Sequence, residues 1–189
     1  YIQNLGLVWA ISSLPPELPS EYYCERPDRF TSRVAKMGIE LQLSSDSVSE
    51  EFASLLTLMA GEIGDNSFAH NVGNWPDVLG VFFAYDIAKR VIVIADRGRG
   101  VRATLQRVRP NLTTDMDALE VAFTQIVSGR EPEKRGNGLK VVRRVAEEKN
   151  IGLLYRSGIG MVTIPTNPGP MHIEMSDGNI RGTYAVIDF

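Results

Sequence analysis

The sequence has 189 residues, of which 43% are hydrophobic, 23% charged and 8% aromatic. This length suits one domain with a full hydrophobic core and excludes two large domains, and the composition excludes a disordered or fibrous chain. The formal net charge is −3, and no window approaches the roughly 20 apolar residues that a membrane span needs. We therefore expect a globular protein that does not insert into a bilayer.

Cys24 is the single cysteine of the sequence. This count excludes an intramolecular disulfide and a zinc site built from several cysteines. Because chains without disulfides are typical of a reducing compartment, we expect a cytoplasmic protein. The apolar opening of the chain also lacks the positive charges of a secretory signal.

Positive charge gathers in the middle of the chain. From Arg97 to Arg144 there are 11 lysines and arginines against 5 acidic residues, whereas the remainder carries 9 against 18. A basic segment in an acidic chain indicates a local anion site, because a general nucleic-acid-binding domain is usually basic throughout. The sequence shows no clear nucleic-acid site, and a solvated basic surface is the alternative interpretation.

Residues 1–45 contain four prolines and no sustained hydrophobic period. This pattern predicts an irregular arm with one short strand at Gly38 to Leu43. We therefore divide the chain into an N-terminal arm of unknown role, residues 1–45, and a domain over residues 46–189.

A helix is expected from Ser47 toward His70, since Ser47 and Glu50 have the spacing of a capping box and apolar residues then recur at helical intervals. Two β-rich runs follow, Val78 to Tyr85 and Arg90 to Ala95. Their composition and spacing predict an antiparallel hairpin.

The segment from Arg102 to Thr113 is polar, and we predict that it is irregular. Thr114 and Asp117 form a second capping box, which begins a short helix that ends at Gly129. A third helix is expected from Gly138 to about Asn150. Four short strands separated by glycine-containing turns complete the chain: Leu153 to Arg156, Met161 to Pro165, Met171 to Met175 and Thr183 to Phe189.

Helices that lie among hairpin-connected strands predict an α/β (α+β) two-layer sandwich. We expect a mixed, mainly antiparallel sheet with helices on one face.

Glu62 and Asn66 are four residues apart, so on a helix they lie on the same side, at the border of the apolar stripe. Burying a carboxylate and an amide there is costly unless they have partners. A carboxylate can take a proton from water, and an amide oxygen is a suitable ligand for Mg²⁺. By itself such a pair is common and is more often an ordinary polar helix face.

Asp96 ends an apolar strand and opens the run Asp96-Arg97-Gly98-Arg99-Gly100. A carboxylate fixed there can accept a hydrogen bond from an amine deep in a pocket, and glycines let the backbone turn closely around a flat ligand. Adenine offers such an amine. Guanine would oppose a carbonyl oxygen to the carboxylate, at a cost of about 1–3 kcal/mol. An ordinary Asp-Gly turn is the alternative.

The run Gly136-Asn137-Gly138-Leu139 stands at a helix start, directly after Lys134 and Arg135. Backbone N–H groups at a helix start suit phosphates, and two cations add attraction. Glycines are common where a loop meets a helix, so this motif is weak in isolation.

The order and spacing of these three motifs are more specific than any one of them. Residues 62–67 resemble the N box, residues 96–100 the first glycine box and residues 136–139 the second glycine box of the Bergerat-fold (GHKL) ATPases, the histidine kinase-like ATPase superfamily. The run Gly182-Thr183 before the last strand resembles the terminal Gly-Thr strand of that family. The resemblance covers the chain from about Ser47 to Phe189.

The resemblance implies a site for ATP or ADP with Mg²⁺. Asn66 would bind the Mg²⁺ that bridges the phosphates, and Glu62 would position or deprotonate the attacking water. Asp96 would bind the adenine amine, with help from Thr183 directly or through water. Residues 101–135 would be a mobile lid over ATP, which gives their basic excess a physical role. The residues that would shape the base pocket and the phosphate-facing end of the lid are Gly98, Gly100, Lys134, Arg135, Gly136, Gly138 and Leu139.

Two functions remain open at this point. The first is a Mg²⁺-dependent ATP-binding domain that hydrolyses ATP or transfers its γ-phosphoryl group, in signalling or regulation. The second is a non-catalytic module that senses ATP or ADP and docks a protein partner through the N-terminal arm or the lid. Glu62 favours the enzyme, because a sensor does not need a carboxylate beside the γ-phosphate.

Overall fold

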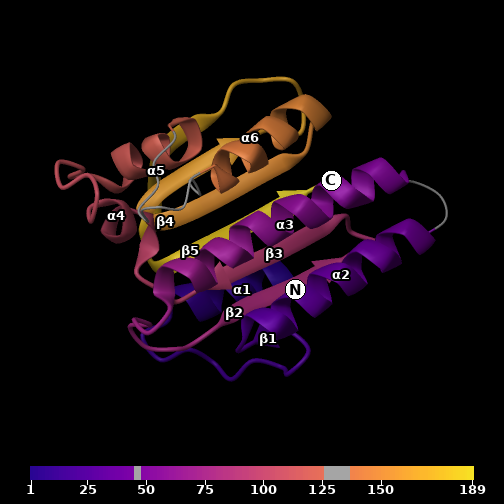
Figure 1. Cartoon of the computed structure of the whole chain (residues 1–189), viewed down its shortest axis with the longest axis horizontal. Coiled ribbons are helices and arrows are strands. Elements are labelled where there is room, and N and C mark those ends of the chain that lie inside the picture. Colours follow the sequence, from indigo (N-terminus) through magenta and orange to yellow (C-terminus); the bar gives the residue numbers. More distant parts are fainter. Residues whose placement is uncertain (45–47, 126–136) are drawn as a thin grey trace.

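The computed structural model describes residues 1–44, 48–125 and 137–189. Within these residues six helices and a five-stranded antiparallel sheet form an α+β fold (Figure 1). The strand order is β1-β2-β3-β5-β4. The elements in chain order are α1 (Ile2–Ile11), β1 (Tyr23–Cys24), α2 (Pro27–Leu43), α3 (Glu50–Asn71), β2 (Val81–Asp86), β3 (Val91–Asp96), α4 (Gly100–Leu105), α5 (Asp115–Thr124), α6 (Gly138–Lys149), β4 (Gly152–Ile164) and β5 (His172–Asp188).

The first 44 residues are not an irregular arm, and this prediction was wrong. They form α1, β1 and α2, and the predicted strand from Gly38 to Leu43 is the C-terminal part of α2. Pro27 occupies the first turn of α2, where its fixed φ and missing N–H are tolerated. Phe30, Val34, Met37 and Leu41 then recur at helical spacing and are buried in the core.

The sheet is covered on both of its faces. Phe83 and Ile94 pack into a cluster with α2 and α3, whereas Phe82 and Val93 pack into a second cluster with α1. Alternate residues of a strand point to opposite faces, which is why neighbouring residues of β2 and β3 enter different clusters. The prediction that helices lie on one face is therefore wrong for α1, which Figure 1 shows behind the sheet when α3 is in front.

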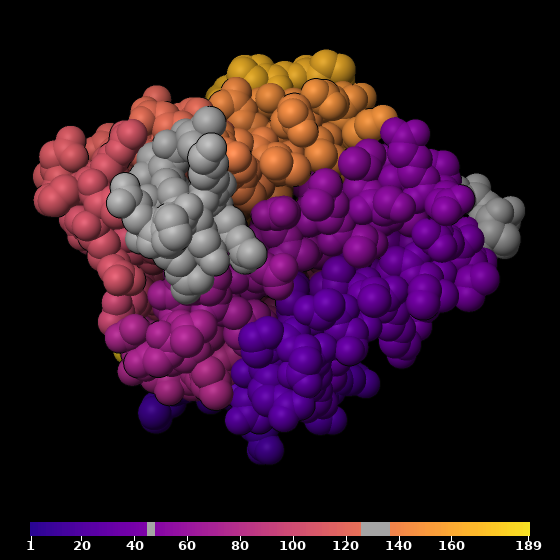
Figure 2. Space-filling model, viewed as in Figure 1, coloured from indigo at the N-terminus to yellow at the C-terminus, as the bar shows by residue number. Residues whose placement is uncertain are grey.

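The larger helical layer consists mainly of α2, α3 and α6. In the space-filling view these helices lie side by side and cover this face of the sheet (Figure 2). Helix α3 begins after Ser49, whose side chain accepts a hydrogen bond from the backbone N–H of Phe52. The cap is thus two residues later than predicted, and Ser47 lies outside the described residues.

Helices α2 and α3 approach closely at Gly64. A Cβ at this position would overlap the ring of Phe30, which lies directly against the glycine. The Phe30 ring also packs edge-on against Phe83 of the sheet, with ring centroids 5.4 Å apart. Gly64 therefore allows an aromatic side chain to fill the space between the two helices and the sheet.

Three predicted features have the expected form. Strands β2 and β3 pair as an antiparallel hairpin. Thr114 caps α5 by accepting a hydrogen bond from the N–H of Asp117, although α5 ends at Thr124 and the predicted end at Gly129 lies outside the described residues. Helix α6 begins at Gly138 and ends at Lys149, and the capping residue Asn150 takes the left-handed conformation.

Two regions have more continuous secondary structure than the sequence predicted. Residues Gly100–Leu105 form α4, within the segment predicted to be irregular. The four predicted C-terminal strands are two continuous strands, β4 and β5, which pair along most of their length. The glycine-containing pair Ser157-Gly158 is not a turn but the start of a register irregularity within β4.

Within the described ranges, no helix combines the length and the apolar character needed to cross a membrane. Cys24, the free cysteine, is buried at the β1 edge of the sheet.

Candidate functional site

Asp96 lies at the end of β3, where it is buried between the sheet and α3, with 1% of its surface exposed. It pairs with Thr183 of β5 in the sheet register. Its Oδ2 accepts hydrogen bonds from Thr183 Oγ1 and, at 2.8 Å, from Ser67 Oγ. Its Oδ1 accepts a hydrogen bond of 2.7 Å from the backbone N–H of Gly98. The carboxylate is thus fixed by a helix, a strand and the glycine-rich loop.

Burial raises the pKa of Asp96 above its usual value of 3.8, because a charged carboxylate is poorly solvated there. The hydrogen bonds from Thr183, Ser67 and Gly98 oppose this rise, since they stabilise the charged form. The protein therefore holds a desolvated acceptor in a fixed orientation, an arrangement typical of recognition sites.

Glu62 and Asn66 lie on the same helix, α3, where Asn66 directly precedes Ser67, and both are half-buried. The first residue of α6 is directly beside them. A Cβ at Gly138 would stand 2.5 Å from Glu62 Oε2 and 3.1 Å from Asn66 Nδ2. The absence of a side chain at Gly138 therefore lets the start of α6 approach the two polar groups, and the next residue, Leu139, is buried in the core.

The loop after Asp96 is attached to the end of α3 by Asn71. The Asn71 side chain donates to the carbonyl of Ser67 at 2.7 Å and accepts from the backbone N–H of Arg99 at 3.0 Å. A Cβ at Gly98 would overlap the Asn71 amide, so the loop needs glycine at this position. Sequence reasoning missed Ser67 and Asn71. Ser67 directly follows Asn66, and Asn71 lies one helical turn after Ser67. This spacing places both side chains on one side of the helix, which is the signal that could have found them.

Two other glycines hold the loop against the sheet. Gly100 has φ +77° and lies beside Ser157, whose Oγ accepts a hydrogen bond of 2.8 Å from the N–H of Val101. Gly182 has φ +66° and packs against both the backbone and the carboxylate of Asp96. Positive φ and close approach each favour glycine, so both positions require glycine for two separate reasons.

Arg97 points in the opposite direction from Asp96. It is fully buried, and its guanidinium donates to both carboxylate oxygens of Asp77, at 2.6 Å from Nη2 to Oδ2. It also donates to the carbonyl of Trp9 and lies 5.8 Å from the centre of the Trp9 ring. The glycine-rich loop is therefore connected to α3 through Asp96 and to α1 through Arg97.

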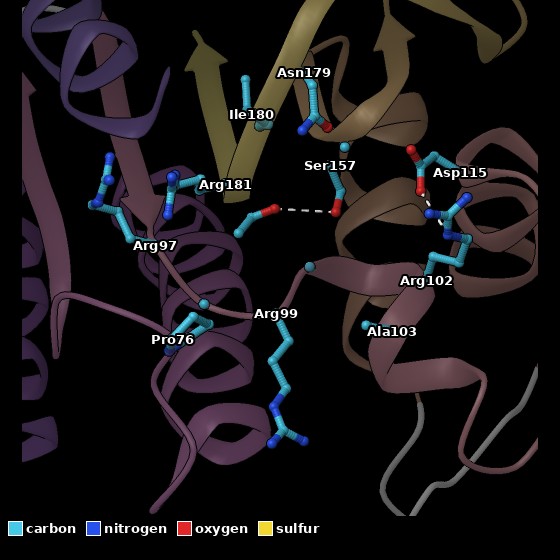
Figure 3. Close-up of a pocket in the computed structure, with 14 residues that line it drawn as sticks. Pro76, Arg97, Arg99, Arg102, Ala103, Asp115, Ser157, Asn179, Ile180 and Arg181 are labelled. Atoms are coloured by element: carbon cyan, nitrogen blue, oxygen red, sulfur yellow. Dashed lines mark hydrogen bonds and ion pairs between the residues drawn. The ribbon is translucent and has the colours of Figure 1, made fainter. Parts of the chain in front are cut away.

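A basic pocket of about 250 Å³ lies next to this loop (Figure 3). Its walls come from the loop, from α4 and α5, and from β4 and β5. The charged residues that line it are Arg97, Arg99, Arg102, Asp115 and Arg181. Gly98 and Gly100, which were predicted to shape a base pocket, line it, whereas its arginine lining was not predicted, because Arg102 and Arg181 come together only in the folded chain.

The structure brings most of the predicted site residues together along α3. Asp96, Thr183 and Gly98 form one cluster, and Glu62, Asn66 and Gly138 form the second, next to it. Three predicted phosphate-binding residues lie outside the described residues: Lys134, Arg135 and Gly136. In the described part of the chain, no group of three or more His, Cys, Asp or Glu side chains could hold a metal ion.

A scan against protein-family models and a search of curated proteins found no match to this chain.

Proposed function

We propose that the chain is a Mg²⁺-dependent ATP-binding domain with the Bergerat fold, which hydrolyses ATP or transfers its γ-phosphoryl group. The observation that carries the proposal is the set of contacts made by α3. Through Ser67 this helix contacts the pair formed by Asp96 and Thr183. Through Glu62 and its neighbour Asn66 it also contacts the start of α6. Motifs that are distant in the sequence thus contact the same helix at neighbouring positions.

Asp96 is the group that we expect to recognise the base. Its hydrogen bonds with Ser67, Thr183 and Gly98 fix the carboxylate before a ligand arrives, which lowers the ordering cost of binding. The exocyclic amine of adenine can donate to a carboxylate. Guanine presents a carbonyl at the same edge, so two acceptors would be opposed at a cost of about 1–3 kcal/mol.

The other cluster is suited to the triphosphate. Asn66 and Glu62 offer the hard oxygen ligands that Mg²⁺ prefers, and both are only half-buried. When bound, Mg²⁺ supplies charge neutralisation to the phosphates. The N–H groups at the start of α6 attract phosphate oxygens, and Gly138 leaves room for their approach. The roles of Lys134, Arg135 and Gly136 stay predictions.

Glu62 is the group that would orient or deprotonate the attacking water. We expect Glu62→Gln to bind MgATP as the parent protein does and to lose turnover by a factor of about 10²–10⁴, because the amide cannot accept the proton. ADP release, measured with a coupled enzyme assay, tests this expectation.

The matched control is Glu50→Gln, which changes an exposed carboxylate in the first turn of the same helix and should leave turnover unchanged. Equal turnover in Glu62→Gln and the parent protein would overturn the catalytic role of Glu62. A parent protein that binds MgATP and releases no ADP would instead indicate the non-catalytic sensing module.

A further inference from the structure

The basic pocket lies against the glycine-rich loop, and Arg97 rather than Asp96 is among its lining residues. None of its lining residues comes from α3 or α6, the helices of the nucleotide site proposed above. Arg97 lines the pocket, whereas its neighbour Asp96 faces α3. The pocket therefore adjoins the proposed nucleotide site, with which it shares Gly98, Gly100 and Gly182, but its arginines and Asp115 belong to it alone.

Positive charge exceeds negative charge around the pocket. Four arginines line it, and the one carboxylate among its lining residues belongs to Asp115. A second carboxylate, that of Asp77, pairs with Arg97 and with Arg181. Two carboxylates thus face four guanidinium groups, which leaves an excess of positive charge that attracts an anion.

Two of the arginines are placed to contact a ligand. The side chains of Arg102 and Arg181 are 42% and 49% exposed, and each is oriented by a carboxylate, Arg102 by Asp115 at 3.2 Å and Arg181 by Asp77 at 3.3 Å. Figure 3 shows Arg181 and Arg97 on one side of the pocket and Arg102 with Asp115 on the other. Arg97 is fully buried, so it contributes a fixed charge rather than a contact.

The size of the pocket limits its ligand. A volume of about 250 Å³ is smaller than the roughly 300–1,000 Å³ of sites for drug-sized molecules. The pocket therefore suits a small anionic group. A tetrahedral phosphate can offer oxygens to both walls at once, whereas a planar carboxylate directs its two oxygens toward one of them.

We propose that this pocket binds a phosphate group, as inorganic phosphate or as the monoester of a small molecule, between Arg102 and Arg181. Guanidinium groups bind phosphate oxygens through paired, charge-assisted hydrogen bonds. Asp115 opposes binding, because its carboxylate lies on the same wall as Arg102. The phosphate displaces part of the Arg102–Asp115 interaction when it binds.

The experiment is a titration of the full chain with inorganic phosphate at constant ionic strength, followed by amide chemical shifts in NMR spectra. We expect shifts at Gly158 and Asn179 of the pocket. The double variant Arg102→Gln/Arg181→Gln should bind phosphate at least tenfold more weakly. Arg26→Gln/Lys36→Gln removes the same number of charges elsewhere and should bind as the parent protein does, because both side chains are exposed and distant from either candidate site in the chain.

A second variant changes affinity in the opposite direction. Asp115→Asn removes a negative charge from the wall and retains an oxygen that can accept the hydrogen bond from the N–H of Ile159. It should bind phosphate several-fold more tightly. A folding defect cannot produce tighter binding, so this variant keeps the test informative if the arginine double variant is unstable.

Glycerol phosphate in place of inorganic phosphate distinguishes the two sources of the group. Tighter binding of the ester indicates a small phosphorylated molecule, and binding of inorganic phosphate alone indicates the free ion. The proposal is overturned if phosphate produces no more shift than chloride, or if the arginine double variant binds unchanged. Shifts confined to the start of α6 would also overturn it, and they would support the nucleotide site instead.

Discussion

Two neighbouring residues connect the glycine-rich loop to opposite layers of the molecule. Asp96 bonds to Ser67 of α3, and Arg97 bonds to Asp77 and to the carbonyl of Trp9 in α1. The alternation of a β-strand explains this divergence, since successive side chains point to opposite faces. One residue serves the candidate nucleotide site, and the next fixes the wall of the basic pocket.

The pairing of Asp77 with Arg97 predicts a pH dependence of stability. Partial burial opposes ionisation of Asp77, but hydrogen bonds from Arg97 and the charges of Arg97 and Arg181 outweigh it, so the pKa of Asp77 is lowered from 3.8. Stability from this group is present above pH 3.8 and is lost as the pH falls through the lower folded-state pKa. Asp77→Asn should lack this loss.

Urea unfolding from pH 7 to pH 2.5 measures the effect. At pH 7 we expect Asp77→Asn to be less stable by about 3 kcal/mol, because it leaves the buried guanidinium of Arg97 without its charged partner. The difference from the parent protein should shrink below pH 3.8. Glu174→Gln, on an exposed part of β5, is the control that should follow the parent curve. A difference that is constant with pH would contradict this account of Asp77.

At the scale of elements, α3 links the parts of the candidate site. It packs on α2 along its length, and its C-terminal half also carries the polar residues that contact β3, β5 and α6. The close approach to α2 depends on Gly64, against which the ring of Phe30 lies. The position of the polar residues therefore depends on how closely the two helices pack.

Gly64→Ala tests this packing. Alanine favours a helix over glycine by about 1 kcal/mol, but a Cβ at this position overlaps Phe30. We expect a net loss of about 1–3 kcal/mol in the free energy of unfolding, the usual cost of overpacking. Gly61→Ala is the matched control on the same helix, because no atom lies within 4 Å of its added Cβ. It should stabilise the protein, and a loss of stability in both variants would contradict the packing argument.

The sequence predicted elements best where local signals agree. The β2–β3 hairpin has a clear β-rich composition, and α5 begins at its predicted cap, Thr114. Helix α2 was missed because nearby prolines were taken as a sign of irregular structure, although Pro27 begins the helix. Strands β4 and β5 were each divided in two, because Ser157-Gly158 and Asp177-Gly178 look like turns but lie within paired strands.

The candidate site was predictable in part for the same reason. Asp96 and Glu62 stand in recognisable local motifs, whereas Ser67 and Asn71 gain their partners only from the packing of α3 on the loop. The basic pocket depends on the register of β5 against β3 and β4. A register of this kind is a long-range property that no local pattern contains.

At the scale of the whole molecule, the sheet is covered on both faces, and the two candidate sites meet at the glycine-rich loop. On one side α2, α3 and α6 cover the sheet and hold Asp96, Asn66 and Glu62. On the other side α1 packs on β2, β3 and β5 and holds Arg97. The first 44 residues contribute to both cores, so they stabilise the arrangement that brings the two sites to the same loop.

The most direct test of the central claim is thermal unfolding with MgATP and with MgGTP. At a ligand concentration of 100 times Kd, binding adds about 2.7 kcal/mol, which raises Tm by roughly 5–11 °C for a chain of this size. We predict this rise with MgATP and little rise with MgGTP. Asp96→Asn should lose most of it, whereas Asp177→Asn, which changes an exposed carboxylate of β5, should keep it. Equal rises with both nucleotides, or no rise with either, would contradict the account.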